Sequence, residues 1–252
     1  MKVSYSGVLV EIEQAPCTPS GWLKGSGIFE TLRTIDGQAL ALSRHLRRAE
    51  KSALSAGLTL PKKDSIVSAI NDLLLAQPCA HGLLRISFDR NGQWAAVHLP
   101  YEPVVQGARL RTHPDALISK GETIKKYPYG YRLAIIDEAK LLGFDEAIVH
   151  NTEANICEAA VSNLILKIDG HWLTPPTSDG LLAGIMRELV IEHCQVGVDS
   201  VPLSRINDIS AAVLLSSLRI AQAVTSIDGR ELEPSQGFVD EIHAMALLHS
   251  VD

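Results

Sequence analysis

The sequence lacks the features that mark several classes of protein. No apolar run approaches the roughly 18 residues that a membrane-spanning helix needs, and residues 1–13 alternate apolar and polar residues where a signal peptide would have an apolar block. The glycine-rich motifs GxGxxG and GxxxxGK[ST] are missing, as are internal repeats and low-complexity tracts. We therefore expect a soluble, cytoplasmic protein that is not a nucleotide-binding module of these kinds.

Charge and cysteine content narrow the possibilities further. The formal net charge is −6, so the chain has no basic footprint for nucleic acid or for an anionic membrane. The four cysteines are scattered without the spacing of metal ligands, and we expect no metal. Reduced, half-buried thiols are favoured over a disulfide framework. The cysteines are Cys17, Cys79, Cys157 and Cys194.

The first hundred residues combine strand and helix patterns. Residues 27–34 alternate apolar and polar side chains, and Asp36-Gly37 predicts a hairpin turn after them. Leu46, Ala49 and Ala53 recur at helical spacing before Gly57, a helix stop. The order of strands, helices and strands predicts a small α+β domain. The expected strands are residues 2–12, 27–34, 39–42, 82–88 and 94–99, and the expected helices are residues 43–57 and 61–75.

A stretch of proline, glycine and polar residues at positions 101–107 is the candidate linker. It divides the 252 residues into a small N-terminal domain, residues 1–104, and a larger C-terminal domain, residues 105–252. In the larger domain the expected strands are residues 108–112, 147–150, 162–168, 171–174 and 212–216, and the expected helices are about residues 129–142, 184–194 and 239–249.

The stretch from Lys125 to Asn163 combines a lysine pair with an acidic residue among small neighbours. Lys125 and Lys126 precede the expected helix, and Glu158 follows the expected strand. In pyridoxal 5′-phosphate (PLP) chemistry a lysine amine forms the Schiff base and a carboxylate faces the pyridinium nitrogen. Lysine and glutamate are common surface residues, so this pairing needs support from a phosphate site elsewhere in the chain.

Short motifs in a fixed order supply that support. The order resembles that of the class IV (fold type IV) PLP-dependent aminotransferases from about Gly25 to Leu232. This group includes branched-chain aminotransferases, D-amino acid aminotransferases and 4-amino-4-deoxychorismate lyases. The resemblance implies an α/β (α+β) two-domain fold, with a small N-terminal α+β domain and a larger β-rich pseudobarrel domain with helices. The motifs are residues 27–33 (GIFETLR), 36–37 (DG), 45–48 (HLRR), 143–147 (GFDEA), 158 with 162–163 (E and SN), 174–176 (TPP), 184–187 (GIMR) and 227–229 (IDG).

The resemblance also implies roles for individual residues. Lys125 corresponds to the Schiff-base lysine and proton shuttle, and its spacing to the Glu138-Ala139 pair favours it over Lys126. Glu158 corresponds to the partner of the pyridinium nitrogen. The further cofactor residues it implies are Tyr129 at the phenolic oxygen, Asn163 in the motif that follows Glu158, and Arg48, Gly184, Ile185, Met186, Ser216 and Ser217 around the phosphate.

Substrate recognition is less sharply indicated. Substrates of this family carry carboxylates, so arginines near the pocket are the natural candidates, although each could equally form a surface ion pair. This chain has Ser26 where the family often has Asp and Leu218 where it often has Thr, which leaves the substrate class open. The family often has Gly where this chain has Ala159, and alanine still allows close approach to a flat cofactor. The candidates are Arg85, Arg90 and Arg219, with Phe29 as a pocket wall.

Three functions compete on this sequence. The leading one is an aminotransferase that uses an amino acid or amine and a 2-oxo acid. The second is a 4-amino-4-deoxychorismate lyase, which residues 184–187 and the compact length favour. The third is a PLP-binding scaffold without turnover. Resemblance implies a homodimer with shared active sites.

Overall fold

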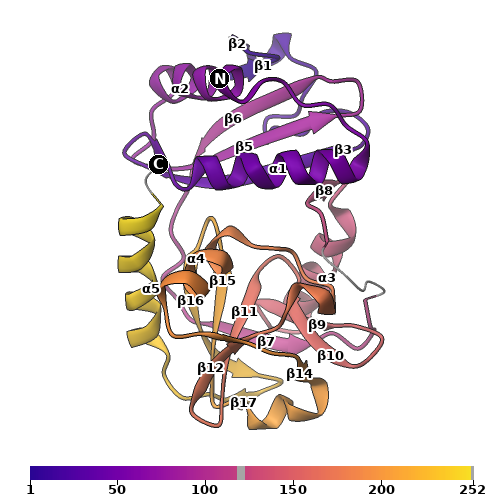
Figure 1. The fold of residues 1–252 in the computed structure, drawn as a ribbon, viewed down its shortest axis with the longest axis vertical. Helices are drawn as coiled ribbons and strands as arrows, with labels where there is room; N and C mark the ends of the chain where they lie inside the picture. Colours follow the sequence, from indigo (N-terminus) through magenta and orange to yellow (C-terminus); the bar gives the residue numbers. More distant parts are fainter. Residues whose placement is uncertain (118–122, 251–252) are drawn as a thin grey trace. The chain divides into compact units, whose positions relative to one another are not determined.

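The computed structural model describes residues 1–117 and 123–250, and the chain forms two compact units (Figure 1). The first unit contains Met1–Pro103, Ile124–Pro128 and Ser250, and the second contains the described residues of Val104–Thr123 and Tyr129–His249. Residues 124–128, which include Lys125, therefore belong to the first unit, whereas a single boundary after residue 104 would assign them to the second.

The first unit is built on a seven-stranded sheet in which every pair is antiparallel. Its strand order is β2-β1-β6-β5-β3-β4, and β8 pairs with β3 at Gly27 and Ile28. The strands are β1 (Lys2–Tyr5), β2 (Val8–Glu11), β3 (Gly27–Ile35), β4 (Gln38–Ala39), β5 (His81–Asp89), β6 (Trp94–Pro100) and β8 (Lys126–Tyr127).

Two helices, α1 (Leu42–Ala56) and α2 (Lys63–Ala76), pack against this sheet and share one hydrophobic core with it. On β3 and β5 alternate residues enter that core, among them Ile28 and Leu32 opposite Phe88 and Leu84. Because side chains alternate between the faces of a strand, Phe29 and Arg85 belong to the other face. The alternation of side chains along β3 and β5 thus places two candidate site residues, Phe29 and Arg85, on the face opposite the core.

Tight turns set the register of the sheets. Asp36-Gly37, between β3 and β4, and Asp169-Gly170 both have two consecutive positive φ angles, the conformation of two-residue hairpin turns. Ser6-Gly7 does the same between β1 and β2. The single strand expected over residues 2–12 is therefore wrong: the chain reverses at this turn and forms a hairpin.

The second unit is built on a ten-stranded sheet of order β13-β12-β11-β15-β16-β7-β9-β10-β14, with β17 beside β16. Most pairs are antiparallel, and the parallel ones are β12 with β13, β7 with β16, and β7 with β9. The strands are β7 (Ala108–Thr112), β9 (Glu146–His150), β10 (Asn155–Ala159), β11 (Asn163–Ile168), β12 (His171–Thr174), β13 (Gly197–Val198), β14 (Val201–Pro202), β15 (Ala211–Ser216), β16 (Ile220–Ile227) and β17 (Arg230–Glu231).

Three helices pack on this sheet: α3 (Gly130–Leu141), α4 (Ile185–His193) and α5 (Gln236–His249). Ile135, Ile136 and Ala139 of α3 share a core with Ala147 and Val149 of β9. Strands β10 and β16 were absent from the sequence-based expectation, and β10 carries Glu158. In the described part of the chain, no helix combines the length and apolarity needed to cross a membrane.

Two leucines of α2 test the assignment of the first core. Leu73 is fully buried, whereas the side chain of Leu75, two residues later, is 81% exposed. We expect Leu73→Ala to lower the free energy of unfolding by about 2–5 kcal/mol, because it removes buried methyl groups and leaves a cavity. Leu75→Ala should change it by less than about 0.5 kcal/mol. Urea unfolding followed by circular dichroism measures both, and equal losses would contradict this core.

Candidate active site

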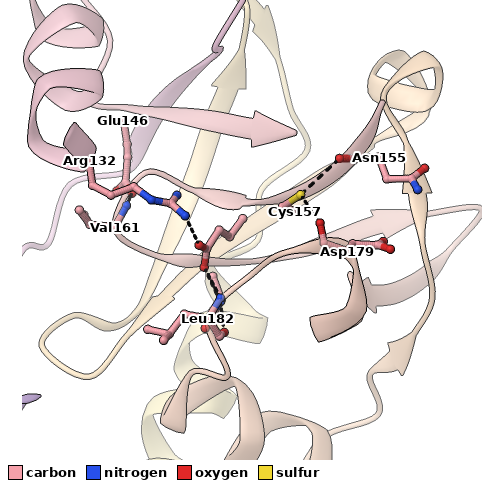
Figure 2. A network of polar contacts seen from close by, with 9 residues as sticks. Arg132, Glu146, Asn155, Cys157, Val161, Asp179 and Leu182 are labelled. Carbon is pink, nitrogen blue, oxygen red and sulfur yellow. Dashed lines mark hydrogen bonds and ion pairs between the residues drawn. The ribbon is translucent and has the colours of Figure 1, made fainter. Parts of the chain in front are cut away.

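Glu158 is a buried carboxylate that three segments of the second unit hold in place, and Figure 2 labels two of its donors, Arg132 and Leu182. Its Oε2 accepts hydrogen bonds from Asn163 Nδ2 at 3.0 Å and from the backbone N–H of Leu182 at 3.1 Å. Its Oε1 accepts one from Arg132 Nη2 at 2.9 Å, which is also an ion pair. Hydrogen bonds and an opposite charge both favour the ionised form of a carboxylate. Glu158 is therefore a fixed acceptor for a cationic or N–H group.

A register shift in β10 places this side chain. Ile156 lies opposite His150 and Glu158 lies opposite Val149, so the pairing with β9 is offset between them. Such irregularities re-aim side chains and are common near functional sites. At the offset, the Cys157 thiol donates to the carbonyl of Asp179 at 2.9 Å. Burial, with the negative charges of Glu158 and Asp179, raises the pKa of Cys157 to about 12, so this thiol stays protonated.

The turn that follows β10 is anchored by a second buried carboxylate, Glu146. Its Oε1 accepts from the backbone N–H of Val161 at 2.8 Å. Its Oε2 accepts from Arg219 Nη1, which also donates to Ser162 Oγ at 2.8 Å. The structure therefore places Arg219 in a network that fixes the turn between Glu158 and Asn163.

The start of α4 lies against this turn. Asn163 begins β11, pairs with Leu215 of β15, and donates from Nδ2 to the carbonyl of Leu182 at 3.0 Å. A Cβ on Gly184 would lie 1.8 Å from Asn163 Oδ1, so any larger residue there would displace the Asn163 side chain. Since no side chain caps the helix, its first N–H groups are available to bind an anion. Glu158, Asn163, Gly184 and the end of β15 thus come together.

The remaining residues expected at the phosphate follow from this arrangement. Ile185 and Met186 form the first turn of α4, and both are buried. Ser216 ends β15, and its Oγ accepts from the backbone N–H of Arg219 at 3.2 Å. Ser217 is the next residue, in the connection to β16.

Arg187, in the first turn of α4, holds the preceding loop. Its Nε donates to Thr174 Oγ1 at 3.0 Å and its Nη2 to the carbonyl of Pro175 at 2.7 Å. Burial lowers the pKa of Arg187, and the negative charge of Glu158 opposes that shift. Arg187 is thus a second positive charge within electrostatic reach of Glu158.

In the first unit, Lys125 lies against β3. Its carbonyl accepts from the backbone N–H of Phe29 at 2.9 Å, and its Nζ lies 4.6 Å from the centroid of the Phe29 ring. Lys125 is half-buried, while Lys126 is exposed. An ammonium over an aromatic face is attracted by the ring, so this contact orients the amine of Lys125.

Arg48 belongs to a buried triad with Glu30 and His45. Arg48 Nε donates to Glu30 Oε1 at 2.9 Å, and His45 Nδ1 lies 2.7 Å from Glu30 Oε2. Burial alone would raise the pKa of Glu30, but the charges and hydrogen bonds of Arg48 and His45 outweigh it and lower that pKa to about 2. Burial lowers the pKa of His45, while the Glu30 carboxylate opposes that shift. Because an ionised carboxylate can only accept a hydrogen bond, Nδ1 is the donor to Glu30.

The remaining candidates from the sequence are Arg85, Arg90 and Tyr129. The Arg85 guanidinium lies 4.3 Å from the Trp22 ring centroid and donates to the Ser20 carbonyl at 2.8 Å. Arg90 is exposed in the turn after β5, and Tyr129 immediately precedes α3. Among the described residues, no cluster of three His, Cys, Asp or Glu side chains is arranged to hold a metal ion.

Sequence reasoning missed Arg132, Leu182 and the triad partners Glu30 and His45. Arg132 lies seven residues after Lys125 in the sequence and carries no motif signal. Leu182 acts through its backbone, which no residue type reveals. Glu30 and His45 lie within the motifs that carry the family resemblance. Glu30 also lies on the face of β3 whose other residues, Ile28 and Leu32, enter the core, and a glutamate at such a position is the signal that could have found the triad.

The triad makes a testable contribution to stability. The pKa of Glu30 falls from 4.5 to about 2 on folding, so its stabilisation is complete above pH 4.5 and is lost as the pH falls towards 2. We expect Glu30→Gln to lower the free energy of unfolding at pH 7 by about 3 kcal/mol, because Arg48 loses its buried partner. The difference from the wild type should shrink between pH 4.5 and 2.

Urea unfolding at several pH values measures this difference. Glu138→Gln is the matched control, because Glu138 pairs with Arg111 but is 47% exposed, and it should cost less than about 1 kcal/mol. A Glu30→Gln effect that is equally small, or independent of pH in this window, would refute the assignment.

Comparison with known proteins places these observations in a family. Residues 27–227 match the family model described as amino-transferase class IV. A bifunctional aminodeoxychorismate lyase / D-amino acid transaminase of Mycobacterium tuberculosis is 25% identical over 244 residues, covering 83% of this chain and 84% of that protein.

Solved structures share the fold. The branched-chain aminotransferase of Thermoproteus uzoniensis with norvaline has a TM-score of 0.86 at 24% identity, covering 98% of this chain and 95% of that one. An aminotransferase of Mycobacterium tuberculosis in its PLP-bound form has a TM-score of 0.84 at 20% identity, covering 100% and 99%. The family match spans most of the chain, and the chain belongs to the class IV aminotransferases.

Proposed function

We propose that this enzyme uses PLP to transfer an amino group between an amino acid or amine and a 2-oxo acid. The observation that carries the proposal is Glu158, a buried carboxylate whose two oxygens are held by donors from α3, from the start of β11 and from the loop before α4. Such a group suits the ring nitrogen of PLP. When bound, PLP would supply the electron sink that stabilises negative charge at the substrate carbon.

The residues present fit that cofactor. The uncapped start of α4 at Gly184, the crowding of Gly184 against Asn163, and the nearby end of β15 provide backbone N–H groups and a serine hydroxyl for a phosphate. Charge-assisted bonds from an arginine would complete such a site. We assign Gly184, Ile185, Met186, Ser216, Ser217 and Arg48 to the phosphate, Tyr129 to the phenolic oxygen, and Glu158 with Asn163 to the ring nitrogen.

We assign the covalent attachment of the cofactor and the movement of the substrate proton to Lys125. A neutral amine at Nζ can take a proton from the substrate carbon and return it, which is general base and then general acid catalysis. Desolvation favours the neutral form of an amine, and Lys125 is half-buried against Phe29. The adjacent Lys126 is exposed, which supports the choice between the two lysines.

Substrate recognition rests on the arginines and on the aromatic face of β3. We assign Phe29 as a pocket wall, because the Lys125 ammonium lies over its ring. Arg85 and Arg90 remain proposals for binding a substrate carboxylate. Arg219 remains a weaker one, because its guanidinium is already paired with buried Glu146. A cytoplasmic homodimer is our proposal for the assembly, by analogy with the family.

A lyase that forms 4-aminobenzoate and pyruvate is the second candidate. The segment 184–187 (GIMR) favours it, and the similar protein of Mycobacterium tuberculosis carries both lyase and transaminase in its name.

A paired assay tests the proposed activity. We expect purified enzyme with PLP to convert at least one D- or L-amino acid in the presence of 2-oxoglutarate, measured as formation of glutamate. The same preparation is tested for release of pyruvate from 4-amino-4-deoxychorismate. Pyruvate release without transamination of any donor would overturn the proposal in favour of the lyase.

The lysine assignment has a spectroscopic test. We expect Lys125→Ala to abolish the absorbance of bound cofactor near about 400 nm and to reduce kcat by at least about a thousandfold, because attachment and proton transfer are both lost. Lys126→Ala is the matched control and should keep both. Loss of the band in Lys126→Ala alone would show that the attachment site is one residue further along the chain.

A further inference from the structure

We propose that Arg132 is a positioning residue that acts through Glu158 and weakens the hold of this carboxylate on the proton of the cofactor's ring nitrogen. The inference rests on the proposed function, in which Glu158 faces that nitrogen. In this inference Arg132, which lies outside the sequence motifs, controls the protonation of the cofactor's ring nitrogen through its charge.

The geometry of Arg132 carries the proposal. It stands in the first turn of α3, and its Nη2, on the guanidinium labelled in Figure 2, donates to Glu158 Oε1. The ion pair of 2.9 Å is on Oε1, while Asn163 and Leu182 hold Oε2. The side chains are only 16% and 7% exposed, so water screens the pair weakly.

A second observation concerns the Nη1 atom of Arg132. Its Nη1 is buried and has no hydrogen-bond partner among the described residues. A buried N–H without a partner costs free energy, and the ion pair with Glu158 offsets that cost.

The other charges around Glu158 do not replace this pair. Arg187, from α4, adds positive charge, but it donates hydrogen bonds to Thr174 Oγ1 and to the carbonyl of Pro175. On β10 itself, Cys157 is a protonated thiol, and beyond it Asp179 adds negative charge. Arg132 is therefore a cation in direct contact with the carboxylate.

The sign of the effect follows from charge alone. An isolated carboxylate beside a ring nitrogen favours the protonated, cationic ring. A guanidinium on the same carboxylate reduces its basicity and also repels the ring's positive charge, so both effects favour loss of the ring proton. Removing the charge of Arg132 should therefore strengthen protonation and raise the pKa of the ring nitrogen by about 1–3 units.

Holoenzyme loaded with PLP labelled with ¹⁵N in the ring reports this directly. The ¹⁵N chemical shift, followed against pH, distinguishes the protonated from the neutral ring. We expect Arg132→Gln to titrate at a pH higher than the wild type by about one unit or more. At pH values where the ring nitrogen is partly deprotonated in the wild type, it should remain protonated in the variant. Arg132→Met is a second neutral variant, and Arg132→Lys should restore the wild-type curve.

Arg111→Gln is the matched control. Arg111 forms an ion pair of the same length, 2.9 Å, but with Glu138, and its side chain is 18% exposed. It should leave the ¹⁵N curve unchanged. An unchanged curve in the neutral Arg132 variants, or an equal shift in Arg111→Gln, would overturn the inference.

Glu158→Gln separates this inference from the proposed function. If that variant shifts the ¹⁵N resonance towards the neutral ring while the neutral Arg132 variants match the wild type, only the role of Arg132 fails. If the wild type binds no PLP, or if Glu158→Gln leaves the resonance unchanged, the proposed function or its assignment of Glu158 fails, and the role of Arg132 fails with it.

Discussion

The ionised Glu158 carboxylate is the constraint on which the candidate site depends. A charge buried this deeply is stable only with paired charge and hydrogen bonds. The three donors come from α3, from the start of β11 and from the loop before α4. Fixing one side chain therefore fixes the relative positions of three segments, and it does so next to the helix start that suits an anion.

The same device recurs in both units. Glu30 of β3 binds Arg48 and His45 of α1, and Glu146 of β9 binds Arg219 and the turn after β10. Each carboxylate ties a strand to a distant part of the chain. Donors and charges fixed by folding need no rearrangement when a ligand arrives, which is the condition for electrostatic preorganisation. In this protein the buried acids provide stability and also determine where polar groups converge.

The sequence predicted the parts of the fold that depend on local chemistry. Asp36-Gly37 and Asp169-Gly170 form hairpin turns because both residues tolerate positive φ. Gly57 ends α1 in the left-handed conformation, as its position after a helical pattern predicts. Strand β10 was missed because its identity depends on pairing with β9 and β14, not on a strong alternating pattern. Ser6-Gly7 was missed because apolar residues continue on both sides of it.

The sequence by itself determined the family resemblance, the candidate lysine and carboxylate, and the glycine at the start of α4, because those depend on residue type and order. Tertiary structure alone decided how the polar groups are paired. It placed Arg219 on Glu146, Arg48 on Glu30 and Arg132 on Glu158, choices among chemically equivalent arginines that no linear pattern distinguishes. The physical reason is that a long cationic side chain reaches whichever buried carboxylate the fold brings within about 3 Å, and that proximity is set by strand pairing and helix packing across the chain.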